Sequence, residues 1–140
     1  MRHFTILMFV ASALCAAEFQ TDSLRYAVGP NGRNQSVSDR RTGKNYLAQP
    51  SPLMVITKNG QRIVSTAASL DGESLRVKFG ASGIEATLRV RTLPRYLTLE
   101  LTALSDTSVS LVELANLPLT LTKYVSRTIA TCRDDEYAVA

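Results

Sequence analysis

The chain has 140 residues, 16 Lys and Arg against 12 Asp and Glu, a formal net charge of +4, one histidine and no tryptophan. This length fits a single domain. The positive charge is mild and dispersed, so the composition excludes the basic, aromatic-interleaved surface of a nucleic-acid-binding protein.

The N-terminus has the pattern of a cleavable signal peptide over residues 1–17. Arg2 supplies the positive start, Phe4 to Leu14 form an apolar run, and small residues follow up to Ala17. The run is too short for a membrane span, which needs about 20 residues. The pattern predicts a secreted or periplasmic protein with one domain over residues 18–140 and no membrane span after cleavage. A signal anchor is the alternative.

Cysteine and histidine limit the chemistry further. Lipid attachment at Cys15 is disfavoured because the bulky Leu14 precedes it, where such sites have a small residue. Cleavage would also remove His3 and leave Cys132 as the single cysteine. The mature chain would then lack an internal disulfide, the nucleophile systems that depend on histidine, and histidine-ligated metal sites. We expect no cofactor.

Short strands separated by turn residues dominate the rest of the chain. Asn-Gly and Asp-Gly pairs, which suit tight hairpin turns, recur at short intervals. The expected strands are Leu24 to Val28, Asn34 to Ser38, Pro52 to Thr57, Arg62 to Ser65, Leu75 to Phe79, Gly83 to Thr92, Tyr96 to Leu104 and Val109 to Thr122. Only Thr66 to Leu70 could form a helical turn. This spacing predicts an all-β fold, an antiparallel β-sandwich.

One hairpin can be predicted to its register. Apolar and polar residues alternate on both sides of a turn at Pro94-Arg95, so each strand has one apolar and one polar face. Centring the turn there places Arg89 opposite Glu100 and Leu88 opposite Leu101. A shift of one residue would bury both charges, so the register should be fixed. In the last predicted strand, Pro118 cannot donate a ladder hydrogen bond, which indicates an edge or a bulge.

The candidate site residues are three consecutive acids, Asp134, Asp135 and Glu136. Adjacent acids on a turn are usually solvated charge, but they can also contact a cation or a carbohydrate, or act in acid–base catalysis of glycosidic bonds. We expect no catalytic residue in this chain, and the sequence does not decide whether the chain binds a metal ion. The chain then stops on the apolar residues 137–140, which suggests an N-terminal fragment of a longer protein.

Two motifs near the N-terminus carry a family resemblance. Tyr26-Ala27-Val28-Gly29-Pro30-Asn31-Gly32 is a strand followed by an Asn-Gly turn, and Asp39-Arg40-Arg41-Thr42-Gly43-Lys44-Asn45-Tyr46 follows the pattern Asp-x-x-Thr-Gly-x-x-Tyr. Together they resemble the opening strands of the supersandwich (galactose-mutarotase-like) domains that precede the catalytic domain of many secreted bacterial glycoside hydrolases. The pattern extends over about residues 26–122, and none of its motifs is catalytic.

The resemblance implies a non-catalytic, carbohydrate-associated accessory domain of a secreted or periplasmic glycoside-hydrolase-like protein. Its partners would be a carbohydrate and a downstream catalytic domain of the same polypeptide. The chain is short for a complete supersandwich, so the sandwich is expected to be incomplete. The alternative function is a stand-alone binding or adhesion module of the cell envelope, and a third class is an enzyme acting by itself on a glycan.

Overall fold

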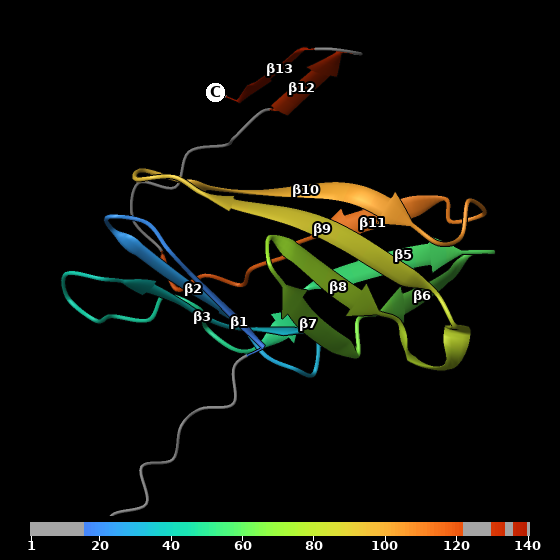
Figure 1. Cartoon of the computed structure of the whole chain (residues 1–140), viewed down its shortest axis with the longest axis horizontal. Helices are drawn as coiled ribbons and strands as arrows, with labels where there is room; N and C mark the ends of the chain where they lie inside the picture. The colour runs from blue at the N-terminus through green and yellow to red at the C-terminus, as the bar shows by residue number, and fades with distance from the viewer. Residues whose placement is uncertain (1–15, 122–129, 134–135, 140) are drawn as a thin grey trace, which may run out of the picture.

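A computed structural model of the chain describes residues 16–121, 130–133 and 136–139. Its regular elements are almost all antiparallel strands, which confirms the all-β prediction (Figure 1). They are β1 (Ala17–Gln20), β2 (Leu24–Val28), β3 (Arg33–Asp39), β4 (Ser51–Pro52), β5 (Met54–Lys58), β6 (Gln61–Val64), β7 (Ala67–Asp71), β8 (Ser74–Lys78), β9 (Glu85–Thr92), β10 (Leu97–Leu104), β11 (Leu111–Leu114), β12 (Ala130–Arg133) and β13 (Glu136–Val139). A 3₁₀ turn, η1 (Gly80–Ser82), joins β8 to β9.

The strands form three antiparallel sheets within residues 16–121 and one separate hairpin. The sheet orders are β1-β2-β3-β4, β10-β9-β8-β7 and β11-β5-β6, while β12 pairs with β13. In Figure 1 the sheet of β7 to β10 crosses in front of the β11-β5-β6 sheet, and strands β1 to β3 lie beside them at the left. The fold is therefore an antiparallel β-sandwich, as the alternation in the sequence predicts. No helix among the described residues is long and apolar enough to cross a membrane.

One hydrophobic core lies between the layers. Its fully buried side chains come from all three sheets: Val28 from β2, Met54 and Ile56 from β5, Leu75 and Val77 from β8, and Leu88 from β9. In β9 burial alternates along the strand, because successive side chains point to opposite faces of a sheet. This shared core holds the three sheets in one packed unit.

A buried asparagine lies at the edge of this core. The side-chain oxygen of Asn34 accepts a hydrogen bond from the Tyr26 hydroxyl. Its amide donates to the Ser51 hydroxyl at 2.9 Å and to the Pro52 carbonyl at 3.0 Å. Asn34 therefore links β2, β3 and β4, and its polar atoms are satisfied, as a buried amide requires.

The predicted register of the β9–β10 hairpin is confirmed. Arg89 lies opposite Glu100, and Leu88 lies opposite Leu101. The two charged side chains form an exposed ion pair of 3.4 Å. A bulge follows between Leu101 and Ala103. The bulge shifts the alternation, so that Leu104 pairs with Ala86 and returns to the core side.

Two predicted segments differ from the structure. Residues 66–70 do not form a helical turn, because Ala67–Asp71 is strand β7, paired with β8. The predicted strand Val109 to Thr122 is regular only over β11, which pairs with β5. Beyond β11, the segment around Pro118 makes one isolated bridge, between Leu119 and Leu47. Strand β1, which the sequence did not predict, begins at Ala17 and pairs with β2.

Candidate functional site

The predicted acidic site cannot be assembled from the described residues. Asp134 and Asp135 lie outside them, and Glu136 is described only as the first residue of strand β13. A role for these three acids in binding a carbohydrate or a cation therefore stays a prediction. Elsewhere in the described residues, no group of three or more histidine, cysteine, aspartate or glutamate side chains could hold a metal ion.

A polar hollow of about 230 Å³ lies on the outer surface of the β1–β4 sheet. Its lining residues are Gln20, Arg25, Ser38, Asp39, Arg40 and Gly43. The register explains why they meet: Gln20 of β1 is opposite Arg25 of β2, and Arg25 is opposite Ser38 of β3. These three residues thus form a row across neighbouring strands. We call this hollow the arginine pocket.

The far wall of the arginine pocket is a capped turn after β3. The Asp39 carboxylate accepts hydrogen bonds from the backbone N–H groups of Arg41 at 2.7 Å and Thr42 at 3.1 Å. The Gly43 N–H donates to the Asp39 carbonyl at 2.8 Å, and Gly43 has a φ of +71° that favours glycine. The Asp-x-x-Thr-Gly motif is therefore an Asx turn, in which aspartate and glycine fix the backbone.

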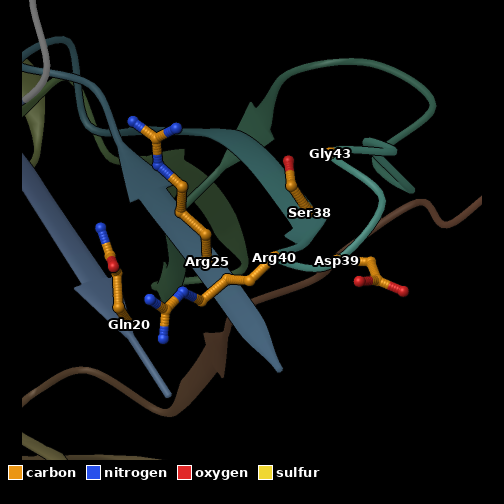
Figure 2. A pocket seen from close by; sticks show the side chains of 6 residues that line it. All are labelled: Gln20, Arg25, Ser38, Asp39, Arg40 and Gly43. Atoms are coloured by element: carbon orange, nitrogen blue, oxygen red, sulfur yellow. The ribbon is translucent and has the colours of Figure 1, made fainter. Parts of the chain in front are cut away.

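Two guanidinium groups give the arginine pocket its positive character. Arg25 donates to Glu18 at 2.6 Å, and the Arg25 side chain is still 54% exposed. Arg40 donates to the Thr21 carbonyl at 2.5 Å, which holds its side chain across the sheet. In Figure 2 the Asp39 carboxylate points away from both guanidinium groups. A guanidinium has five N–H donors, so Arg40 can serve an acceptor in addition to the Thr21 carbonyl.

The carboxyl groups around the arginine pocket are held in their ionised form. The hydrogen bond from Arg25, with a second from Gln20, lowers the pKa of Glu18. Backbone hydrogen bonds from Thr42 and Arg41 lower the pKa of Asp39. A general acid for glycosidic cleavage needs a raised pKa, so neither carboxyl group suits that role. The geometry suits recognition of an anion and hydroxyl groups instead of proton transfer.

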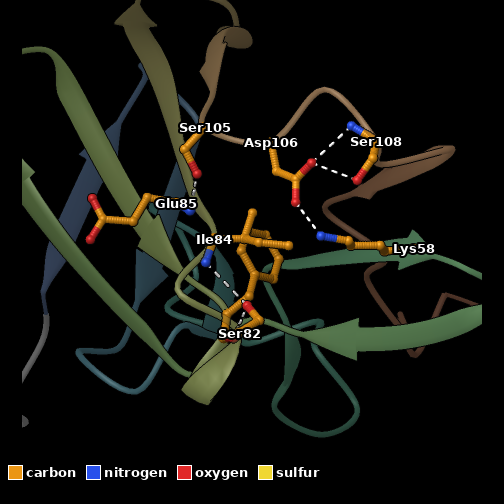
Figure 3. Close-up of polar contacts among 8 residues, drawn as sticks. Lys58, Ser82, Ile84, Glu85, Ser105, Asp106 and Ser108 are labelled. Carbon is orange, nitrogen blue, oxygen red and sulfur yellow. Dashed lines mark hydrogen bonds and ion pairs between the residues drawn. The ribbon is translucent and has the colours of Figure 1, made fainter.

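A second polar cluster joins the β9–β10 sheet to β5 and has a structural role. Asp106 accepts hydrogen bonds from the Ser108 N–H at 2.8 Å and hydroxyl at 2.6 Å, and from Lys58 at 2.5 Å (Figure 3). The nearby Ser105 hydroxyl accepts from the Glu85 N–H at 2.9 Å. These bonds, the one from Lys58 first among them, lower the pKa of Asp106. These bonds hold loop 105–110 against β5 and the start of β9.

Sequence patterns pointed to part of this site. The Asp39 to Gly43 corner is one of the motifs that carry the family resemblance, but Arg40 was not expected to bind anything. Gln20 and Arg25 were missed because no strand was predicted over residues 17–20, and the pairing of β1 with β2 is a tertiary feature. The useful signal was the polar residues at outward positions of β2 and β3, which are Arg25, Ser36 and Ser38. No model of a protein family, no curated protein and no solved structure matches this chain.

Proposed function

We propose that this chain is a non-catalytic, carbohydrate-associated accessory domain of a secreted or periplasmic glycoside-hydrolase-like protein, and that the arginine pocket contacts an acidic saccharide. The observation that carries the proposal is the row of Gln20, Arg25 and Ser38 beside Arg40. The resemblance to supersandwich domains supports a glycoside-hydrolase-like parent protein, and the signal-peptide pattern supports its export.

The chemistry of the arginine pocket favours a sugar carboxylate. Arginine binds carboxylates through two parallel hydrogen bonds, and such charge-assisted bonds are about twice as strong as neutral ones. The Gln20 amide and the Ser38 hydroxyl add donors and acceptors of the kind that ring hydroxyl groups need. The volume of about 230 Å³ suits one or two sugar rings lying on an open surface. In the parent protein, a downstream catalytic domain would act on the glycan that this domain holds.

The test is binding of a glucuronic-acid oligosaccharide, followed by NMR or calorimetry, with the carboxyl-reduced oligosaccharide as the matched ligand. We expect the acidic form to bind and Arg25→Gln and Arg40→Gln each to weaken it about tenfold, because each loses a charged hydrogen bond. Arg41→Gln is the control, since Arg41 is exposed beside the pocket but does not line it. Equal binding of the reduced form, or equal loss with Arg41→Gln, would contradict the proposal.

A separate assay addresses the non-catalytic part of the proposal. The purified chain should release no reducing ends from the oligosaccharide that it binds. The lowered pKa values of Glu18 and Asp39 make both carboxyl groups unsuited to act as the general acid. Turnover that survives Arg25→Gln would place an active site elsewhere in the chain and would favour the enzyme class. Binding without turnover fits both the accessory domain and the stand-alone envelope module, and these differ in whether the natural protein carries a catalytic domain.

A further inference from the structure

The outer edge of β10 is open within the described residues 16–121. In the sheet order β10-β9-β8-β7, β10 is a terminal strand, and it has eight residues. An edge strand of this length is a template for pairing with another strand, which proteins usually prevent with charges, prolines or short edges. In β10 these protections are limited to one charge, Glu100, and the bulge after Leu101, and residues 97–104 contain no proline.

The direction of the free backbone groups follows from the hairpin. The Leu93 N–H donates to the Tyr96 carbonyl at 2.8 Å, so this pair is hydrogen-bonded. Bonded and non-bonded pairs alternate in an antiparallel ladder. Thr98 and Glu100 therefore bond to β9, whereas the N–H and C=O groups of Leu97, Leu99 and Leu101 point outward from the sheet.

The same three leucines also leave apolar surface uncovered. Leu97 and Leu99 are half-buried, and Leu101 is 39% exposed although its partner Leu88 is fully buried. Leu97 and Leu99 also line an apolar groove of about 140 Å³. The other residues lining the groove are Leu24, Tyr26, Val37, Ala115 and Leu117. The open edge and the apolar surface are thus continuous.

We propose that β10 pairs with β10 of a second copy of this chain, antiparallel, about a two-fold axis at Leu99. In this register Leu99 faces Leu99 of the other copy and Leu97 faces Leu101, all with outward backbone groups. On the polar face, Thr98 lies opposite Glu100. The contact is isologous, so the two four-stranded sheets join into one continuous sheet.

Charge favours this register over the neighbouring register that is centred on Glu100. Moving the axis to Glu100 would also match outward backbone groups, but it would place Glu100 directly opposite itself. Like charges directly opposite each other on paired strands are destabilising. The axis at Leu99 avoids this repulsion and keeps all three leucines on the apolar side. Five residues of each copy meet before the bulge after Leu101, so the interface is small. We expect a weak association, because stable interfaces bury more than about 1,000 Å² of surface.

The decisive variants change Thr98, which is exposed and faces Arg91 within the monomer. Thr98→Lys would face Glu100 of the second copy twice in the dimer, and we expect dimerisation to strengthen about three- to tenfold. Thr98→Glu should weaken it by a similar factor. The expected effects on the monomer are opposite, because Arg91 repels a lysine and attracts a glutamate at that position. Because each variant should change dimerisation and monomer stability in opposite directions, a change in dimerisation cannot be explained by a change in folding stability.

Sedimentation equilibrium of the full chain over a range of concentrations measures the association, and thermal unfolding at low concentration measures monomer stability. Ser69→Lys and Ser69→Glu are the matched controls. Ser69 is an exposed residue of the other edge strand, β7, and it faces Arg76 as Thr98 faces Arg91. The controls should not change the association. A monomer at every concentration, or equal effects of the Ser69 and Thr98 variants, would overturn the proposal.

A cross-linking experiment tests the register. In T98K, carbodiimide should join the introduced amine to Glu100 of the other copy, forming an amide with loss of water. A mixture of isotope-labelled and unlabelled chains identifies links between copies by mass spectrometry. Mixed-isotope peptides joining positions 98 and 100 support the axis at Leu99. A dimer whose mixed-isotope links lie elsewhere would overturn it.

Discussion

Strands β9 and β10 show the same alternation in sequence but differ in burial. In β9, Ala86, Leu88 and Val90 are at most 4% exposed, whereas in β10 Leu97 and Leu99 are only half-buried. The strands are paired over almost their whole length. The difference lies in their neighbours: among the described residues, β9 has a strand on both sides and β10 pairs with β9 alone. Alternation therefore determines which face a side chain takes, but the neighbouring strands determine how well it is covered.

The largest expected effect contrasts two facing leucines of this hairpin. Leu88→Ala should lower the free energy of unfolding by about 3 kcal/mol, because it removes a fully buried side chain and leaves a cavity. Leu101→Ala, at the opposite position, should cost about 1 kcal/mol because its side chain is partly in water already. Urea unfolding of both variants measures the difference. Equal losses would show that β10 is as well covered as β9.

A second contrast compares two glycines with positive φ. At Gly32, with φ of +68°, an added Cβ would lie 2.9 Å from the Ala67 backbone nitrogen. At Gly60, with φ of +75°, it would meet nothing within 4 Å. Gly32→Ala should cost about 2–3 kcal/mol and Gly60→Ala about 1 kcal/mol, because only the first adds a backbone clash to the strain. Thermal unfolding separates the two, and a reversed order would contradict the close packing of the turn at Gly32 against the start of β7.

A third test removes one polar contact at the border of the core. Tyr26→Phe deletes the hydroxyl group that donates to Asn34, leaving that buried acceptor without this partner. We expect a loss of about 1–2 kcal/mol. The measurement is urea unfolding, with Tyr46→Phe as the control because Tyr46 lies at a partly exposed position. If the two substitutions had the same effect, the Tyr26–Asn34 contact would not contribute to stability.

The smallest expected effect concerns pH and the partly exposed pair of Lys58 and Asp106. The pKa of Asp106 is lowered in the folded state, so its contribution to stability is present above the unfolded-state value, near 4, and is lost as the pH falls. Asp106→Asn should therefore lower the melting temperature modestly at pH 7, and the difference from the original chain should shrink near pH 3. A difference that is constant with pH would show that the charge of Asp106 is not involved.

Local patterns predicted the strands well, and distant contacts account for what was missed. The Leu88–Leu101 register followed from alternation and one turn, both of which are local. Strand β7 was missed because Ala67-Ala68-Ser69 has little strand preference, and pairing with β8 determines its structure. The arginine pocket was missed because it depends on the order β1-β2-β3, which no local pattern encodes. The predicted site at Asp134, Asp135 and Glu136 remains untested.

Amide hydrogen exchange along β10, measured at low and high protein concentration, tests most directly whether this edge is open and closes by pairing. At low concentration we expect the Thr98 and Glu100 amides to exchange slowly and the Leu97, Leu99 and Leu101 amides to exchange fast. At high concentration the three leucine amides should become protected as dimers form. Uniform protection along β10 at low concentration, or leucine amides that stay unprotected at every concentration, would contradict this account.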